Sequence, residues 1–184
     1  MKALDRFLQK WRIRVALPFI RQGDRLLDIG CYDRSLIDRA LPRISSAVGI
    51  DSEIVASRDD RVEILQGSFP TAQLFEEDSF DCITMLAVLE HVEEPAALAA
   101  ECQRILVPGG RLILTVPHPA VDLVLDALMF FRLADGMSTE EHHGFDVGQT
   151  RPIFEEAGLE FLRERCFQLG LNRLFVFEKP TVDG

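Results

Sequence analysis

The chain has 184 residues, 47% of them hydrophobic, which suits a single globular domain over residues 1–184 with a core of its own. The net charge of -10 comes without any block of Lys or Arg, which argues against free DNA or RNA as a partner. No signal peptide and no bilayer-spanning apolar run is evident, so we expect a soluble, cytoplasmic protein without a transmembrane segment.

The first third of the chain predicts one helix followed by alternating short elements. Residues 1–22 contain an amphipathic helix whose apolar stripe comprises Leu4, Phe7, Leu8, Trp11, Val15 and Phe19. A strand is expected at about 25–29, and a short helix begins near Ser35, which is a suitable cap for it. Further strands are expected at 47–50 and 62–66, with a turn at 67–70.

The remainder of the chain continues the alternation of strands and helices. The predicted elements are a strand at 80–85, a helix at 95–106, a strand at 111–116, a helix at 150–157 and strands at 160–167 and 172–179. Only a short link separates the last two strands, so they form an antiparallel hairpin. The pattern predicts an α/β fold: a Rossmann-like, mostly parallel sheet of seven strands with a terminal antiparallel hairpin and helices on both faces.

Two apolar runs that end in aspartate carry the strongest functional signal. The run Leu26–Cys31 contains Asp28-Ile29-Gly30, which is typical of a buried strand that leads into a tight turn. The run Val48–Asp51 ends in a carboxylate one βαβ unit later. This spacing suits a nucleoside ligand, because backbone approaches it at the first turn and the second acid accepts hydrogen bonds from ribose hydroxyls.

Five short blocks in this order resemble the class I S-adenosylmethionine-dependent methyltransferases, over roughly residues 20–179. The blocks are residues 27–31, 49–51, 66–70, 80–92 and 106–111. The resemblance implies S-adenosylmethionine as cofactor and S-adenosylhomocysteine as product. The family's first turn usually contains three glycines at alternate positions, whereas here Gly30 is followed by Tyr32 and Arg34. Ser68 stands where the family often has an aspartate for the adenine amino group.

The resemblance also assigns cofactor-binding residues. It places the methionine end at Asp28, Gly30 and Cys31, the ribose at Asp51 and Ser52, the adenine at Ser68 and Phe69, and the sulfonium near Leu86. Structural alternatives stay open: Asp51 caps a helix before Glu53, Ser68 only forms a turn, and Phe69 is an ordinary buried side chain.

The charge around the first turn helps to discriminate between cofactors. Asp28 and Asp33 flank this turn and would oppose the pyrophosphate of a dinucleotide. S-adenosylmethionine instead carries an ammonium and a sulfonium, which carboxylates attract. Arg34 either pairs with the methionine carboxylate or is simply solvated. The pattern therefore favours the methyl donor over a nicotinamide cofactor.

Two histidines are candidate general bases for a hydroxyl acceptor. His91 follows the fourth strand at the ligand edge of the sheet, and His143 lies with His142 in the polar loop before the last helix. Alternatively, His91 ties loop backbone together and His143 lies on the surface. Some relatives hold a metal here, but Ala87 replaces the first acid of their set, so no metal is predicted. The four scattered cysteines are expected to be small buried residues.

Residues 117–149 form an insert between the fifth strand and the last helix. Its segment 121–134 is apolar almost all round, which indicates a buried helix, a lid over the acceptor site or a homodimer interface. Met129-Phe130-Phe131 suggests an apolar or lipid-linked small-molecule acceptor, whereas residues 168–175 resemble the ends of methyltransferases of surface-glycan synthesis and suggest a glycan-linked one. The main hypothesis is methyl transfer to oxygen or nitrogen rather than carbon. The alternatives are an inactive methyltransferase-like binding or scaffolding protein, suggested by Tyr32 and Arg34, and, more distantly, a nicotinamide oxidoreductase.

Overall fold

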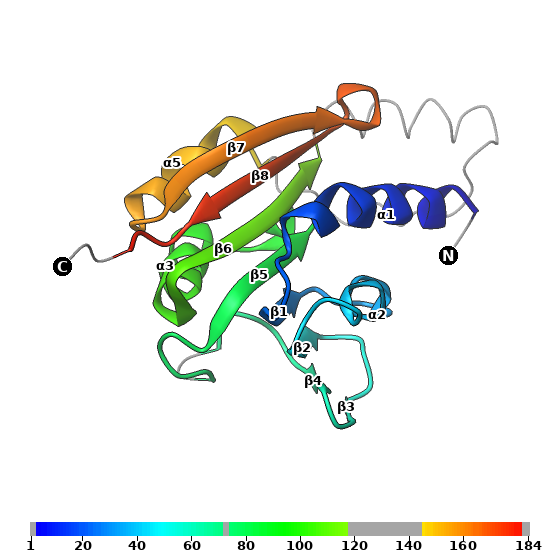
Figure 1. Cartoon of the computed structure of the whole chain (residues 1–184). Coiled ribbons are helices and arrows are strands. Elements are labelled where there is room, and N and C mark those ends of the chain that lie inside the picture. Colours follow the sequence, from blue (N-terminus) through cyan, green and yellow to red (C-terminus); the bar gives the residue numbers. More distant parts are fainter. Residues whose placement is uncertain (1–2, 72–73, 118–144, 182–184) are drawn as a thin grey trace.

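The computed structural model describes residues 3–71, 74–117 and 145–181, which together form one mixed sheet of eight strands with helices on both faces (Figure 1). The helices and strands, in chain order, are α1 (Ala3–Ala16), β1 (Arg25–Ile29), α2 (Ser35–Ala40), β2 (Ser46–Asp51), β3 (Ser57–Arg58), β4 (Val62–Gln66), β5 (Phe80–Leu86), α3 (Pro95–Ile105), β6 (Leu106–Pro117), α5 (Thr150–Glu156), β7 (Glu160–Phe167) and β8 (Asn172–Glu178). Short 3₁₀ turns lie at Leu17–Phe19, Leu89–His91, Val147–Gln149 and Gln168–Gly170. The expected fold class is confirmed.

The strand order explains where a ligand site lies in this fold. The order is β3-β4-β2-β1-β5-β6-β8-β7, in which β4, β2, β1, β5 and β6 run parallel. β8 runs antiparallel to both β6 and β7, as the predicted hairpin requires. The chain moves from β1 in one direction and later returns to add β5 on its other side. In open α/β sheets, ligands bind beyond the carboxyl ends of the strands at such a switch point.

The eighth strand is the only change to the predicted strand count in the described part of the chain. β3 has two residues and pairs antiparallel with β4 at the edge of the sheet. Both of its residues are exposed, so no alternation of apolar and polar side chains marks it in the sequence.

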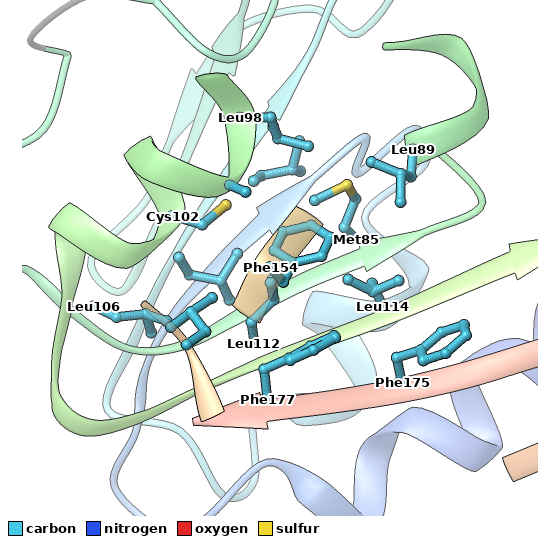
Figure 2. Packing of buried hydrophobic residues seen from close by; sticks show 14 of the residues in the cluster. Met85, Leu89, Leu98, Cys102, Leu106, Leu112, Leu114, Phe154, Phe175 and Phe177 are labelled. Atoms are coloured by element: carbon cyan, nitrogen blue, oxygen red, sulfur yellow. The ribbon is translucent and has the colours of Figure 1, made fainter. Parts of the chain in front are cut away.

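One face of the sheet packs against α3 and α5. Figure 2 shows Leu98 and Cys102 from α3 facing Met85 and Leu112 of the sheet. Phe154 of α5 is fully buried, and its ring centroid lies 5.2 Å from that of Phe177 on β8. This aromatic contact packs α5 against the antiparallel end of the sheet.

The opposite face is covered by α1 and α2. Ile13 and Ala16 of α1 are buried together with Ile37 of α2 and Ile113 of β6. The predicted stripe on α1 is only partly correct, because Val15 is buried whereas Phe7 is 57% exposed. Helical periodicity reveals that α1 has apolar stripes but does not say which of them the sheet covers.

Two smaller predictions also need correction. Ser35 begins α2 but does not cap it; instead the Asp33 Oδ1 accepts a hydrogen bond from the Ser35 backbone N–H at 3.1 Å. Among the cysteines, Cys31, Cys82 and Cys102 are buried as expected, whereas Cys166 on β7 is exposed. β7 is an edge strand with most of its side chains in solvent, which explains that exposure.

Of the predicted insert at 117–149, residues 118–144 lie outside the described residues, and the described end contains the 3₁₀ turn Val147–Gln149. The proposals of a lid or an interface for this segment therefore stay predictions. Within the described ranges, no helix combines the length and the apolar character needed to cross a bilayer.

Candidate cofactor site

The carboxyl ends of β1, β2, β4 and β5 meet at one edge of the sheet. Ile29 of β1 pairs in register with Ile50 of β2 and with Met85 of β5. Asp51, the last residue of β2, pairs with Gln66, the last residue of β4. The turn after β1, the acid ending β2, the turn after β4 and the tip of β5 are thus neighbours. The fold therefore brings together the segments that contain the predicted cofactor residues.

The loop after β1 has a left-handed backbone at three alternate positions. The φ angles are +72° at Gly30, +45° at Tyr32 and +52° at Arg34. Glycine adopts this conformation without strain, whereas each residue with a side chain reduces the stability of the fold by about 1–3 kcal/mol when it adopts it. The loop thus keeps the backbone form of an alternating glycine turn although two of its glycines are replaced.

Gly30 is required by its surroundings as well as by its backbone angle. Its N–H donates to the Ile50 carbonyl oxygen at 2.8 Å. A Cβ atom at this position would lie 2.3 Å from Cγ2 of Val88. Val88 follows β5, so the absence of a side chain at Gly30 lets the segments after β1 and β5 approach closely.

Asp51 fixes the backbone on both sides of the site. Its Oδ2 accepts the Tyr32 N–H at 3.0 Å, and its Oδ1 accepts the Glu53 N–H at 2.9 Å. The second bond is the local contact that the capping alternative predicts, but no helix begins here. Each carboxylate oxygen retains a further acceptor position. Asp51 can therefore hold the first loop and still accept a hydrogen bond from a ligand hydroxyl.

Asp28 is a buried carboxyl group beneath the same loop. It is 3% exposed, and the Thr84 hydroxyl donates to its Oδ1 at 2.6 Å. Burial raises the pKa of Asp28 to about 7; the Thr84 hydrogen bond opposes this shift, while the carboxylates of Asp51 and Asp33 add to it. Burial, Asp28 and Asp51 likewise raise the pKa of the Cys31 thiol to about 12. The site is therefore electronegative, and a cationic ligand would relieve this repulsion.

Asp33 connects the loop to α1. Its Oδ1 accepts the Gln9 side-chain amide at 2.9 Å in addition to the Ser35 backbone N–H. The sequence analysis missed Gln9, Thr84 and Val88 as supports of the site. Thr84 is the register partner of Asp28, and only the strand pairing reveals this relation.

The turn after β4 forms the side of the site that the resemblance assigns to adenine. The Gly67 N–H donates to the Asp51 carbonyl oxygen at 3.0 Å, which places Ser68 next to the end of β2. Ser68 is exposed, and its carbonyl oxygen accepts the Thr71 hydroxyl at 2.6 Å, as the turn alternative predicts. Phe69 is half-buried, with its ring centroid 6.4 Å from that of Phe75. An exposed hydroxyl and a partly covered ring thus lie together at this end.

The remaining candidates differ in how far the structure places them. Ser52 is exposed directly after Asp51, and Leu86 is half-buried at the tip of β5 on the α1 side. His91 is exposed at the end of the turn Leu89–His91, where its N–H donates to the Val88 carbonyl oxygen at 2.9 Å. His143 lies outside the described residues.

The comparisons with known proteins decide the family. A family model for a methyltransferase domain matches residues 2–164. The chain belongs to the methyltransferase domain family. The resemblance inferred from the five sequence blocks is thereby confirmed. No group of three or more metal-ligating side chains lies close enough to bind an ion in the part of the chain that is described.

Relatives with curated names cover parts of the domain. A protein of Mycolicibacterium smegmatis named "Probable S-adenosylmethionine-dependent methyltransferase" is 30% identical over 158 residues, which are 78% of this chain and 60% of the relative. A "Ubiquinone biosynthesis O-methyltransferase" of Paracidovorax citrulli is 33% identical over 99 residues, 48% of this chain and 42% of that protein. The chain thus spans only about half of the length of these relatives.

Solved structures show the fold at low sequence identity. An S-adenosylmethionine-dependent methyltransferase from Mesorhizobium loti gives a TM-score of 0.70 at 18% identity, covering 90% of this chain and 95% of its own. The [4+2]-cyclase SpnF gives a TM-score of 0.68 at 15% identity, covering 92% of this chain and 80% of its own. Because a protein named as a cyclase shares the fold, the fold alone does not decide the reaction.

Proposed function

We propose that this chain binds S-adenosylmethionine at the edge formed by β1, β2, β4 and β5 and transfers its methyl group to an acceptor. The observation that carries the proposal is the loop after β1: its backbone is left-handed at Gly30, Tyr32 and Arg34, its Tyr32 N–H binds the Asp51 carboxylate, and the buried Asp28 carboxyl group precedes it. This loop combines close backbone approach with negative charge, and the family match supports the same cofactor.

The electrostatics favour a sulfonium nucleoside over a dinucleotide. Burial raises the pKa of Asp28, and the nearby carboxylates of Asp51 and Asp33 raise it further, so three carboxyl groups lie together at the loop. The pyrophosphate of a dinucleotide would add two negative charges beside these carboxyl groups, whereas the ammonium and sulfonium of S-adenosylmethionine would offset their negative charge. A nicotinamide oxidoreductase is therefore disfavoured.

The residues have distinct roles in this proposal. Asp28, Gly30 and Cys31 hold the methionine end, Asp51 and Ser52 hold the ribose, Ser68 and Phe69 contact the adenine, and Leu86 lies near the sulfonium. S-adenosylmethionine supplies a methyl group that is already activated for displacement. The protein then contributes mainly by orienting the acceptor and excluding water from it. His91 and His143 are the candidate bases where the acceptor must lose a proton.

The acceptor is proposed to be an oxygen or nitrogen atom of a small or carrier-linked molecule. Several matched relatives are named as ubiquinone biosynthesis O-methyltransferases, which supports oxygen as the acceptor atom. The apolar insert suggests lipid-linked compounds, and the resemblance of residues 168–175 to the ends of surface-glycan methyltransferases suggests glycan-linked ones.

Calorimetric titration with S-adenosylhomocysteine tests the cofactor assignment. We expect binding by the parent chain and at least about tenfold weaker binding by Asp51→Ala, since the loss of one charged hydrogen-bonding group costs about 1.5–3 kcal/mol. The matched control is Asp60→Ala, which removes an exposed carboxylate from the loop before β4 and should leave the affinity unchanged. NAD should not bind. No heat from the parent chain at millimolar S-adenosylhomocysteine would refute the proposal.

The same titration separates the active enzyme from the alternative of an inactive binding or scaffolding protein. Tyr32 has half of its surface in solvent and a left-handed backbone. If its side chain blocks the cofactor, Tyr32→Gly will bind S-adenosylhomocysteine and the parent will not. If the enzyme hypothesis is correct, both chains bind the ligand.

A further inference from the structure

Within the described residues, the helix α1 has an outward face that the fold covers only in part: Trp11 is half-buried and packs partly against the core, whereas Phe7 lies in solvent. Phe7 lies three residues before Lys10 and four before Trp11, and Arg14 lies four residues after Lys10 and three after Trp11, so the four share this face. The ring of Phe7 meets that of Trp11 edge-on, with centroids 5.7 Å apart and an interplanar angle of 72°. Phe7 is 57% exposed, and Lys10 and Arg14 are exposed as well.

The opposite side of α1 already provides the packing that the fold needs. Ile13 and Ala16 are buried against the sheet, as is Ile20 just beyond the helix. The helix thus carries two apolar surfaces, one covered by the sheet and one formed by an aromatic pair beside two cations. We call Phe7, Lys10, Trp11 and Arg14 the α1 outer stripe.

The charge of α1 contrasts with that of the rest of the chain. Residues 3–16 contain four Lys or Arg and one Asp, a net charge of +3, in a protein whose net charge is -10. The remaining residues therefore carry -13. A negatively charged surface would attract α1 and repel the remainder of the molecule, so that this helix is the part that faces such a surface.

Hydrogen bonds fix α1 next to the cofactor edge of the sheet. The Gln9 amide donates to Asp33 in the loop after β1 at 2.9 Å. The Gln168 amide, in the turn between β7 and β8, donates to the Leu8 carbonyl oxygen at 2.9 Å. Figure 1 shows α1 extending past the arrowhead of β5 on this side of the molecule. The outer stripe therefore has a fixed orientation relative to the site.

We propose that the α1 outer stripe docks on the surface of an anionic lipid bilayer. Lys10 and Arg14 pair with the lipid phosphates, while Phe7 and Trp11 enter the interface between head groups and acyl chains. Aromatic rings beside cations on one helix face are typical of helices that lie in this interface. The inference goes beyond the proposed methyl transfer and does not require it, but it would place the cofactor edge close to an acceptor carried in the membrane.

The fluorescence of Trp11 tests this inference directly, because it is the only tryptophan in the chain. Vesicles of phosphatidylglycerol and phosphatidylcholine should shift its emission to shorter wavelength and carry the full chain upward in a flotation gradient. Pure phosphatidylcholine vesicles should do neither. The effect should weaken as salt rises from 0.05 to about 0.5 M, since salt screens charges at the membrane surface.

Two matched variants assign the effect to the outer stripe. Lys10→Glu with Arg14→Glu should reduce partitioning into anionic vesicles at least about tenfold, because each basic residue contributes to binding near the surface. Arg58→Glu with Arg163→Glu makes the same charge change at exposed positions on β3 and β7, and it should retain binding. Titration with S-adenosylhomocysteine shows whether each variant keeps its cofactor site, which separates a failure of this inference from a failure of the proposed function.

Three results would overturn the inference. The first is an unmoved Trp11 spectrum with no flotation at low salt. The second is equal partitioning of the parent and the Lys10→Glu, Arg14→Glu variant. The third is the same spectral shift without lipid, either with increasing protein concentration or with polyglutamate, because a second copy or a soluble polyanion would then be the occupant.

Discussion

Asp28 links the stability of the fold to pH. With a pKa of about 7 in the folded protein and an ordinary value of 3.8, its carboxyl group is protonated in the fold and ionised in the unfolded chain at intermediate pH. The folded state then binds one proton more than the unfolded state, so stability falls as pH rises between these two values. Above pH 7 the Asp28 carboxyl group is ionised in both states, so the folded protein bears the full free-energy cost of burying its charge.

Replacing Asp28 with Asn should remove this pH dependence. The amide oxygen can still accept the Thr84 hydroxyl, but it has no charge to bury. Between pH 5 and pH 8 the parent should lose about 2–3 kcal/mol of unfolding free energy through this group, whereas Asp28→Asn should not. Urea unfolding at both pH values measures the difference. Equal losses in the two chains would show that Asp28 is ionised in the fold at pH 5.

Several residues of the candidate site could be placed at the ends of strands from the sequence, because their position relative to a strand is local information. Asp28 and Asp51 are marked by the apolar runs in front of them, and Gly30 by the turn that follows. Thr84 and Val88 could not be found in this way. They act on Asp28 and Gly30 across the sheet, and this relation depends on strand order and register, which the sequence of one chain does not reveal.

The loop after β1 contains two kinds of left-handed position, which differ in whether a side chain fits there. Tyr32 and Arg34 accept a strained left-handed backbone that the hydrogen bond from the Tyr32 N–H to Asp51 helps to hold. Gly30 is different, since both its angle and the methyl group of Val88 exclude a side chain. The two kinds of position should therefore respond in different ways to substitution.

Gly30→Ala should lower the unfolding free energy by about 2–4 kcal/mol, which combines left-handed strain with overpacking against Val88. Tyr32→Gly should stay within about 1 kcal/mol of the parent, because the relief of strain is offset by the greater freedom of glycine in the unfolded chain. Urea denaturation of the two variants provides the comparison. A Gly30→Ala chain as stable as the parent would contradict the close approach of the segments after β1 and β5.

Most helices and strands could be predicted because each has a clear periodicity or a clear breaker. Pro95 starts α3 as expected, and Gly158 follows α5 with a φ of +91°. β3 was missed because a two-residue exposed pairing leaves no pattern. The buried side of α1 was assigned only in part, because this helix has two apolar stripes and only tertiary packing selects between them.

At the scale of the whole molecule, the sheet determines which thiols are reachable. Cys82 and Cys102 lie within the core and Cys31 lies beneath the loop, whereas Cys166 lies on the exposed edge strand β7. Burial raises the pKa values of Cys82 and Cys102 above their usual range and that of Cys31 to about 12. These three thiols are thus both shielded and kept in the unreactive protonated form.

A disulfide-forming reagent should therefore label Cys166 rapidly at pH 8 and label the buried thiols only when the structure opens. Absorbance of the released chromophore follows both phases. Cys166→Ser should lose the rapid phase and keep the slow one. Rapid labelling of more than one thiol in the folded parent would show that a second cysteine is accessible.

The retained form of the loop after β1 has a consequence for how such domains diversify. Cofactor contacts made by backbone amides do not depend on which side chains project from the same residues. Tyr32 and Arg34 therefore add to this loop a half-exposed phenol and a guanidinium that pairs with Asp38 and Asp59, where glycines would leave nothing. Substitution at these two positions can therefore change the side chains that line the proposed site while the turn itself keeps its form.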